Sequence, residues 1–266
     1  MKYGMRYDNR SRHLNDFDEI FLVYDHPTVG IIEHIQKYKP EQRVILDITG
    51  LSEEDFDKSK DYFSAAAEVH SNIALVGAIG QVRELEESGL PYFFPHIVSC
   101  WDELNGYIKL GVSDVYVGNE FAFNMTYIAN VCRTAGVQVR AYANIAQTNC
   151  ASAANTITQF YIRPEDVVLY EEYIDVIEFY GPLDRQDVLY EIYTKGQWLG
   201  DLSTLIIGLK EEVHNPIITG IFGTLRRDCG KRCSYSPSCN VCTRFVSISN
   251  TLKEAHNEVK ADEASV

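Results

Sequence analysis

Asp114-Val-Tyr-Val-Gly118 and Val137-Gln-Val-Arg-Ala-Tyr-Ala-Asn144 are two short runs rich in β-branched and aromatic residues, a composition typical of buried strands. Between them, residues 121–134 have the spacing of an amphipathic helix, and Gly136 stands where that helix would end. A strand, a helix and a strand in this order predict a βαβ unit whose two strands pair in parallel.

The same alternation extends from residue 18 to residue 207. The runs with strand character are 19–24, 43–48, 73–77, 92–97, 114–118, 137–144, 176–180 and 203–207. Helical patterns lie between them, at 28–38, 52–69, 81–88, 101–110, 121–134, 164–172 and 184–195. Eight strands that alternate with helices predict a (β/α)8 TIM-like barrel, which is an α/β fold.

The chain divides into three predicted parts. With 266 residues, of which 45% are hydrophobic, it can bury one large core. We assign residues 1–210 to the barrel, residues 211–247 to a cysteine-rich segment that packs on the barrel, and residues 248–266 to a polar C-terminal helix and tail.

Acidic residues outnumber basic ones. Lys and Arg total 24 against 38 Asp and Glu, which gives a net charge of -14. This charge opposes non-specific binding to nucleic acid or to an anionic membrane. The N-terminal residues are polar and no apolar run approaches the length of a membrane span, so the expected location is cytoplasmic.

Four of the seven cysteines lie close together in a polar segment near the C-terminus. They are Cys229, Cys233, Cys239 and Cys242, with the spacing C-x3-C-x5-C-x2-C. Nearby basic residues favour the thiolate form that a metal requires: Arg226, Arg227, Lys231, Arg232 and Arg244. Four thiolates suit an iron-sulfur cluster or a tetrahedral zinc ion, so the segment is a predicted metal-binding site. Paired disulfides and unliganded thiols are the alternatives.

Polar residues at the ends of the predicted strands are the candidates for catalysis, because the loops after the strands of a parallel barrel meet at one face. The candidates for proton transfer or for a second metal are Asp25, Asp47, His96, Glu120, Asn144 and Glu178. Each has a structural alternative, since Asp and Asn at strand ends also cap helices and His96 could be a hydrogen-bonded core residue. Asp114 begins its strand, so we expect it to be structural.

Two of the predicted strands also carry a family resemblance. Leu110-Gly-Val-Ser-Asp-Val-Tyr-Val-Gly118 and the strand that ends at Asn144 resemble the G-A-D-x-V-Y-x-G and G-V-K-V-x-x-x-x-N strands of the peptidase U32 family. Residues 161–179 look like a further segment of U32-like members, and the resemblance covers about residues 70–245.

The resemblance implies a TIM-like barrel in which Cys229, Cys233, Cys239 and Cys242 hold a 4Fe-4S cluster. It also implies oxygen-independent or prephenate-dependent hydroxylation of RNA bases or quinone precursors, although protease activity is the older label of the family. The cysteines of family members are spread over a longer stretch than the four cysteines of this chain, which keeps zinc open as the alternative.

Two functional hypotheses follow. In the first, the chain is an enzyme in which the iron-sulfur cluster assists hydroxylation or a related redox modification of a nucleobase or small aromatic substrate. In the second, it is a non-catalytic barrel with a structural zinc site, and it acts as an assembly or interaction component with a protein partner. A peptidase comes third, because the sequence contains no nucleophile motif or metalloprotease motif.

Overall fold

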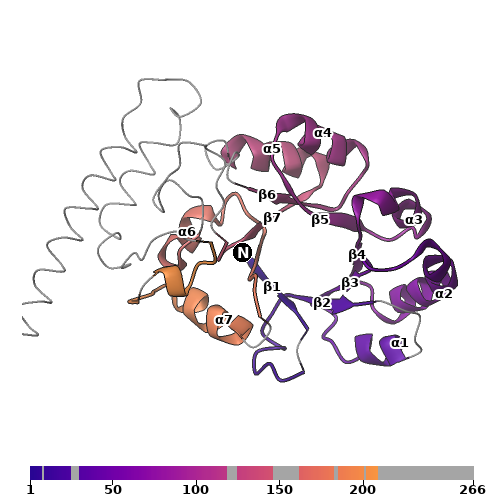
Figure 1. The fold of residues 1–266 in the computed structure, drawn as a ribbon, viewed down its shortest axis with the longest axis horizontal. Helices are drawn as coiled ribbons and strands as arrows, with labels where there is room; N and C mark the ends of the chain where they lie inside the picture. Colours follow the sequence, from indigo (N-terminus) through magenta and orange to yellow (C-terminus); the bar gives the residue numbers. More distant parts are fainter. Residues whose placement is uncertain are drawn as a thin grey trace, which may run out of the picture.

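The structure, a computed structural model, describes residues 1–7, 9–24, 30–118, 125–145, 162–182, 185–200 and 202–208. Within these ranges, eight parallel strands pair in chain order and close into a barrel, with β1 hydrogen-bonded to β8 (Figure 1). The strands are β1 (Lys2–Arg6), β2 (Glu19–Val23), β3 (Arg43–Asp47), β4 (Ile73–Val76), β5 (Tyr92–Val98), β6 (Asp114–Val117), β7 (Gln138–Tyr142) and β8 (Val176–Glu178). The predicted α/β barrel is confirmed.

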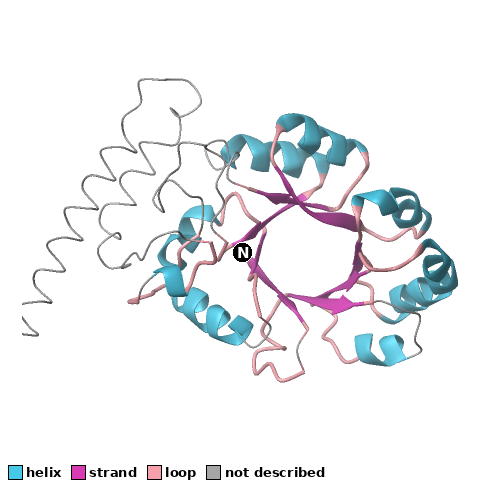
Figure 2. Cartoon of the chain, viewed as in Figure 1, coloured by secondary structure: helices cyan, strands magenta, loops and turns pink. Residues whose placement is uncertain are grey.

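Helices cover the outside of the ring of strands (Figure 2). The α-helices are α1 (Gly30–Ile35), α2 (Glu53–Val69), α3 (Val82–Glu87), α4 (Trp101–Lys109), α5 (Met125–Ala135), α6 (Val167–Tyr170) and α7 (Gln186–Lys195). The short 3-10 helices are η1 (Ile79–Gln81), η4 (Pro164–Asp166) and η6 (Leu202–Thr204). Sequence signals mark their ends: the Asp55 amide donates to Ser52 Oγ at the start of α2, and Gly136 follows α5 with a φ of 72°.

The strand that closes the barrel differs from the prediction. Residues 203–207 are predicted to be the eighth strand, but η6 takes in the first two residues of this run and Ile207 makes an isolated parallel bridge with Ile145. The closing strand is β1, in which Gly4 pairs with Glu19 of β2 and with Glu178 of β8. The apolar side chains of Leu205 and Ile206 are buried, so this run is apolar because it packs on the barrel rather than because it belongs to the sheet.

The connection from β1 to β2 contains no helix among its described residues and packs on α7. The Ser11 hydroxyl and the Arg12 amide both donate hydrogen bonds to the carboxylate of Asp187. The ring centroids of Phe17 and Tyr190 lie 4.5 Å apart. The connection is therefore held to α7 by polar and aromatic contacts.

The barrel has an outer and an inner core, because alternate residues of a strand point to opposite faces. The outer core lies between strands and helices and includes Val44 and Leu46 of β3. The inner core consists of Phe21, Ile45, Ala74, Val76, Phe93 and Tyr116. Charged side chains share the barrel interior with it and are buried: Glu19, Arg43, Asp114, Arg140 and Glu178.

The structure leaves two predictions about the chain open. The predicted domain boundaries at residues 210 and 247 lie outside the described residues. In the described ranges, no helix has both the length and the apolar character that crossing a membrane requires. The cytoplasmic location stays a prediction.

Candidate active site

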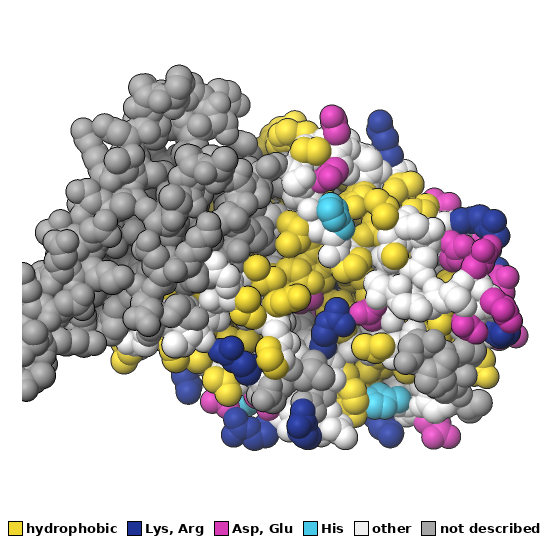
Figure 3. Space-filling view, viewed as in Figure 1, with side chains coloured by type: hydrophobic (Ala, Val, Ile, Leu, Met, Phe, Trp, Pro, Cys, Tyr) yellow, Lys and Arg dark blue, Asp and Glu magenta, His cyan; other side chains and the backbone are white. Residues whose placement is uncertain are grey.

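The candidate site lies at the mouth of the barrel, where the carboxyl ends of the strands meet. The last residues of four strands place polar side chains there: Arg6 of β1, Asp47 of β3, Tyr142 of β7 and Glu178 of β8. Arg6 Nη1 donates to Asp47 Oδ2 at 2.9 Å, which joins β1 to β3 across β2. Viewed along the barrel axis, hydrophobic side chains gather over the centre, with basic and acidic side chains among them (Figure 3).

Glu178 is a buried carboxyl group with two unlike oxygens. Its Oε1 accepts three hydrogen bonds, from Arg140 Nε at 2.8 Å, from Arg140 Nη2 at 2.6 Å and from the Tyr116 hydroxyl at 2.7 Å. Its Oε2 has no hydrogen-bond partner among the described residues. Gly4 leaves space for the Glu178 side chain, because a Cβ atom at this glycine would lie 3.1 Å from Glu178 Cγ.

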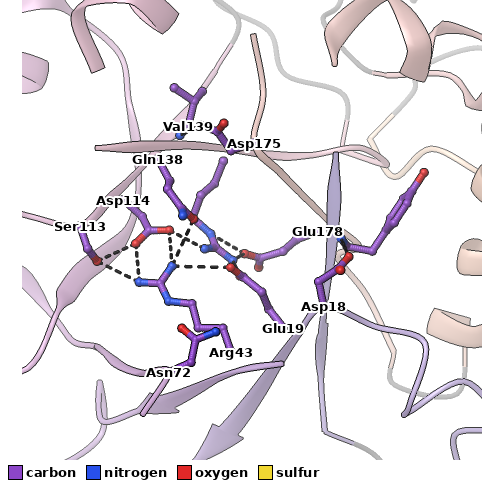
Figure 4. A network of polar contacts seen from close by, with 12 residues as sticks. Asp18, Glu19, Arg43, Asn72, Ser113, Asp114, Gln138, Val139, Asp175 and Glu178 are labelled. Atoms are coloured by element: carbon purple, nitrogen blue, oxygen red, sulfur yellow. Dashed lines mark hydrogen bonds and ion pairs between the residues drawn. The ribbon is translucent and has the colours of Figure 1, made fainter. Parts of the chain in front are cut away.

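Beneath Glu178, charged side chains form a continuous network across the barrel (Figure 4). Arg140 is fully buried, and it also donates to Asp114 Oδ1 at 2.7 Å and to Glu19 Oε2. Arg43 donates from both terminal nitrogens to the Asp114 carboxylate, at 2.7 and 2.8 Å. These paired, charge-assisted bonds link five strands and fix the Arg140 guanidinium against Glu178.

Burial and ion pairing move the pKa values of this network in different directions. Burial alone would raise the pKa of Asp114, but the guanidiniums of Arg140 and Arg43 outweigh it and lower the pKa to about 2. Burial raises the pKa of Glu178, and Arg140 and Tyr116 only partly offset this effect. Burial and the neighbouring Glu178 also raise the pKa of the Tyr116 hydroxyl. Asp114 is therefore held ionised, whereas Glu178 is biased toward its protonated form.

Asp47 is occupied by contacts at both carboxylate oxygens. Its Oδ1 accepts from the Thr49 hydroxyl at 2.7 Å and from the Thr49 amide at 3.2 Å, while its Oδ2 accepts from Arg6. The Arg6 side chain is 48% exposed, and its backbone amide donates to Gln186 Oε1. In this arrangement Asp47 orients a cationic group at the mouth, and its predicted role in proton transfer stays a prediction.

Aromatic rings follow one another from the barrel interior to the mouth. The Tyr116 and Tyr142 rings are stacked, with centroids 4.9 Å apart and an angle of 10° between their planes. The Tyr180 ring meets Tyr142 edge-on at 5.8 Å, and Tyr180 is 54% exposed. These rings offer a planar substrate both a stacking face and an edge.

Asn144 lies beyond the end of β7 and is used as a clamp. Its Nδ2 donates to the Tyr180 carbonyl and its Oδ1 accepts from the Tyr180 amide, both at 2.7 Å. The side chain thus replaces a backbone partner and extends the pairing of β7 with β8. Because both ends of its amide are engaged and the residue is buried, the contact that the structure shows for Asn144 is structural.

His96 lies on β5 but is not brought together with Glu178 and Asp47. Its side chain is 54% exposed, and Nε2 lies 3.7 Å from Glu103 Oε1 of α4. Its ring meets Tyr107, also of α4, at a centroid distance of 6.3 Å. His96 therefore faces the helix layer. It is neither a buried core histidine nor a group inside the barrel.

The other predicted site residues lie outside the described residues. These are Asp25, Glu120, Cys229, Cys233, Cys239 and Cys242. Within the described ranges, no group of three or more His, Cys, Asp and Glu side chains could hold a metal ion. The proposed cluster or zinc site is therefore a prediction from the sequence alone.

Several residues of the site were not among the sequence candidates. Arg140 and Tyr116 occupy inward positions of strands, and Arg6 belongs to a strand that the sequence patterns did not identify. The signal that could have found Arg140 is its place in Gln-Val-Arg-Ala-Tyr, where a charged residue interrupts a buried strand. A buried charge requires a partner, so this arginine predicts carboxylates inside the barrel.

Comparison with known proteins adds no family. No family model and no curated protein matches the chain. The solved structures to which it is similar include tryptophan synthase subunit alpha from Legionella pneumophila strain Paris, with 9% identity and a TM-score of 0.42 over 73% of this chain and 90% of that chain. Another, named as a mandelate racemase/muconate lactonizing enzyme and from Aspergillus oryzae, has 10% identity and a TM-score of 0.38 over 53% of this chain.

The present chain covers 44% of the length of the Aspergillus oryzae protein. Similarities of this size carry no argument about function. The assignment of the barrel therefore depends on the pairing of its eight strands.

Proposed function

We propose that the chain is an enzyme that binds a nucleobase or small aromatic substrate at the barrel mouth and uses Glu178 to transfer a proton during a redox modification such as hydroxylation. The observation that carries the proposal is the unequal environment of the two Glu178 oxygens. Oε1 is held by Arg140 and Tyr116, whereas Oε2 has no described partner. A carboxyl group fixed in this way presents one oxygen to a substrate in a defined direction.

The surroundings of Glu178 fit proton transfer. Burial raises its pKa, which brings the group closer to the pH at which it can both gain and lose a proton. The fixed guanidinium of Arg140 donates two hydrogen bonds to Glu178 Oε1 and so stabilises the negative charge that Glu178 acquires when it loses a proton. General acid-base catalysis by a positioned carboxyl group typically contributes about 100-fold to 10,000-fold to a rate.

The aromatic rings at the mouth support a planar substrate. Tyr180 is more than half exposed and touches Tyr142, whose ring stacks on Tyr116 beside the Glu178 carboxyl. A base or a phenol ring packed on such a surface would gain on the order of 1–3 kcal/mol from stacking. Arg6 could contact a polar substituent at the rim, since almost half of its side chain is exposed.

The redox part of the proposal comes from the cysteine segment. We propose that Cys229, Cys233, Cys239 and Cys242 hold a 4Fe-4S cluster, because four thiolates are the usual ligands of such a cluster. The cluster would supply electron transfer when bound. Zinc on the same four thiolates is the alternative, and it would support a non-catalytic assembly or interaction component.

The first experiment identifies the metal. The full chain is purified without oxygen, and iron, acid-labile sulfide and zinc are measured together with the visible spectrum. Iron and sulfide at about four each per chain, with thiolate-cluster absorbance, is the expected result. A colourless protein with one zinc per chain would overturn the redox proposal and favour the non-catalytic barrel.

The second experiment tests Glu178. Cells that express the wild-type chain, Glu178→Gln or the exposed control Glu86→Gln are compared by mass spectrometry of RNA nucleosides and quinone precursors. We expect a product that depends on the wild-type chain to fall by about 100-fold or more in Glu178→Gln and to persist in the control. Equal product from Glu178→Gln and wild type would exclude proton transfer by Glu178.

A further inference from the structure

The buried network inside the barrel has unequal numbers of acidic and basic groups. Its carboxyl groups are those of Glu19, Asp114 and Glu178, and its guanidiniums are those of Arg43 and Arg140. None of these side chains is more than 9% exposed. An uncompensated buried charge is costly, so the network balances its charge best when one carboxyl group carries a proton.

Asp114 is the carboxyl group least suited to hold that proton. Both of its oxygens accept hydrogen bonds from Arg43, and Oδ1 also accepts from Arg140. The Ser113 hydroxyl donates to Oδ2 at 2.6 Å. Four charged or neutral donors converge on this carboxylate, which leaves no room for a proton of its own.

Glu19 is the next candidate, and it lies between the two guanidiniums. Its Oε2 accepts from Arg140 Nη2, and its Oε1 lies 3.6 Å from Arg43 Nη1 without a hydrogen bond. Both oxygens of Glu19 therefore face a guanidinium. A proton on Oε1 would also be buried without an acceptor among the described residues.

Glu178 contacts one of the two guanidiniums, through Oε1, and its Oε2 has no hydrogen-bond partner among the described residues. A proton on Oε2 keeps all three hydrogen bonds to Oε1, and Glu178 is the last residue of β8, at the mouth of the barrel. We infer that the resting network holds one proton, that this proton is on Glu178 Oε2, and that Glu178 begins its reaction as an acid. Only the role of Glu178 as an acid rests on the proposed function. The position of the proton is a property of the resting protein.

The groups that face Glu178 come from four other strands. Arg140 of β7 opposes protonation, and Tyr116 of β6 opposes it by donating a hydrogen bond to Oε1. Glu19 of β2 favours protonation by its negative charge. Tyr142 of β7 and Arg6 of β1 also lie within electrostatic range of Glu178. Burial is the largest of these influences, and with Glu19 it raises the pKa of Glu178.

Carbon-13 NMR of protein labelled at the glutamate carboxyl carbons tests the inference without a substrate. The Glu178 signal is assigned by its loss in Glu178→Gln, and its chemical shift is followed with pH. We expect the shift of a protonated carboxyl group at neutral pH, with a titration midpoint above the ordinary glutamate value. A midpoint in the ordinary glutamate range would overturn the inference.

Glu19→Gln gives an independent test, because it removes one negative charge while keeping the shape of the side chain. The network then has equal numbers of carboxyl groups and guanidiniums, so we expect the Glu178 midpoint to move to lower pH. Glu86→Gln is the matched control and should leave the midpoint unchanged. An unmoved Glu178 midpoint in a folded Glu19→Gln protein would place the proton elsewhere.

The outcomes separate this inference from the proposed function. An ionised Glu178 in a protein whose product still depends on Glu178 would overturn the inference alone. A protonated Glu178 in a protein whose product is unaffected by Glu178→Gln would overturn the proposed catalytic role alone.

Discussion

Asp114 contributes to stability through its ion pairs with Arg43 and Arg140. The pKa of Asp114 falls from 3.8 to about 2 on folding, so its contribution is fully present above about pH 4 and is lost as the pH falls toward 2. The shift corresponds to about 2 kcal/mol. We predict that Asp114→Asn lowers the free energy of unfolding by at least this amount at pH 7, measured by urea denaturation, and that the difference from wild type shrinks below pH 4.

The matched control for Asp114→Asn is Asp57→Asn, which removes an exposed carboxylate paired with Lys60. Exposed ion pairs contribute about 0–1 kcal/mol, so this variant should unfold close to wild type. A stability gap between Asp114→Asn and wild type that does not change between pH 7 and pH 3 would contradict the ion-pair argument.

Asn144 gives a second residue-level prediction. Asn144→Ala leaves the Tyr180 amide and carbonyl without their side-chain partners, in a partly buried position. We expect a loss of about 1–3 kcal/mol in the free energy of unfolding. Asn105→Ala, on the exposed surface of α4, should change stability little, and thermal unfolding of both variants provides the measurement. Equal stability of the two variants would show that the clamp contributes nothing.

The site could be predicted from the sequence only in part, and single residues show why. Glu178 and Asp47 are found because barrel strands end in polar residues at one face. The same rule selects Asn144, since an amide that clamps backbone and an amide that binds a ligand have the same position in the sequence. Arg140 escapes the rule because it lies in the middle of a strand, where only the partners across the barrel explain it.

At the scale of elements, the helix-free connection from β1 to β2 depends on His13. Its Nδ1 lies 2.9 Å from Asp16 Oδ2 and its Nε2 lies 3.1 Å from Glu191 Oε1 of α7. Hydrogen bonds to Asp16 and Glu191 raise the pKa of His13. The stabilisation is therefore complete below about pH 6.5, the ordinary histidine pKa, and is lost as the pH rises through the raised value.

We predict that His13→Ala lowers the melting temperature more at pH 6 than at pH 9. His34→Ala is the control of opposite sign, because burial and the nearby Lys37 lower the pKa of His34. The contribution of His34 should accordingly grow as the pH rises toward about 6.5. If the effect of His13→Ala on the melting temperature did not vary with pH, the hydrogen bonds of His13 would not be what holds the connection to α7.

The helix ends, which depend on neighbouring residues, are predicted correctly from the sequence. The strand that closes the barrel is not, because its identity depends on pairing with distant strands. The cap at Ser52 and the end of α5 at Gly136 are set within a few residues, and both are correct. The run at residues 203–207 has the composition of a strand, but the place beside β8 is taken by β1. Lys2 and Arg6 give β1 the composition of a polar terminus, and local composition does not show that Arg6 faces the polar mouth.

For the whole molecule, closure makes β1 a required part of the barrel. β1 pairs with β2 and with β8, and Gly4 lies beside Glu178 and Arg140 over the buried network. Removing residues 1–6 would leave two unpaired sheet edges and let water reach the network. We predict that this deletion abolishes cooperative thermal unfolding, measured by circular dichroism and calorimetry.

Removal of residues 209–266 is the matched deletion, because all eight strands and the 3-10 helix at Leu202–Thr204 remain. We expect this shorter chain to unfold cooperatively. If residues 203–207 could close the barrel in place of β1, the chain that lacks residues 1–6 would melt much like the full chain. That result would overturn the assignment of β1 as the closing strand. Loss of cooperative unfolding in the N-terminal deletion alone would instead establish that the pairing of β1 with β2 and β8 holds the network and the mouth together.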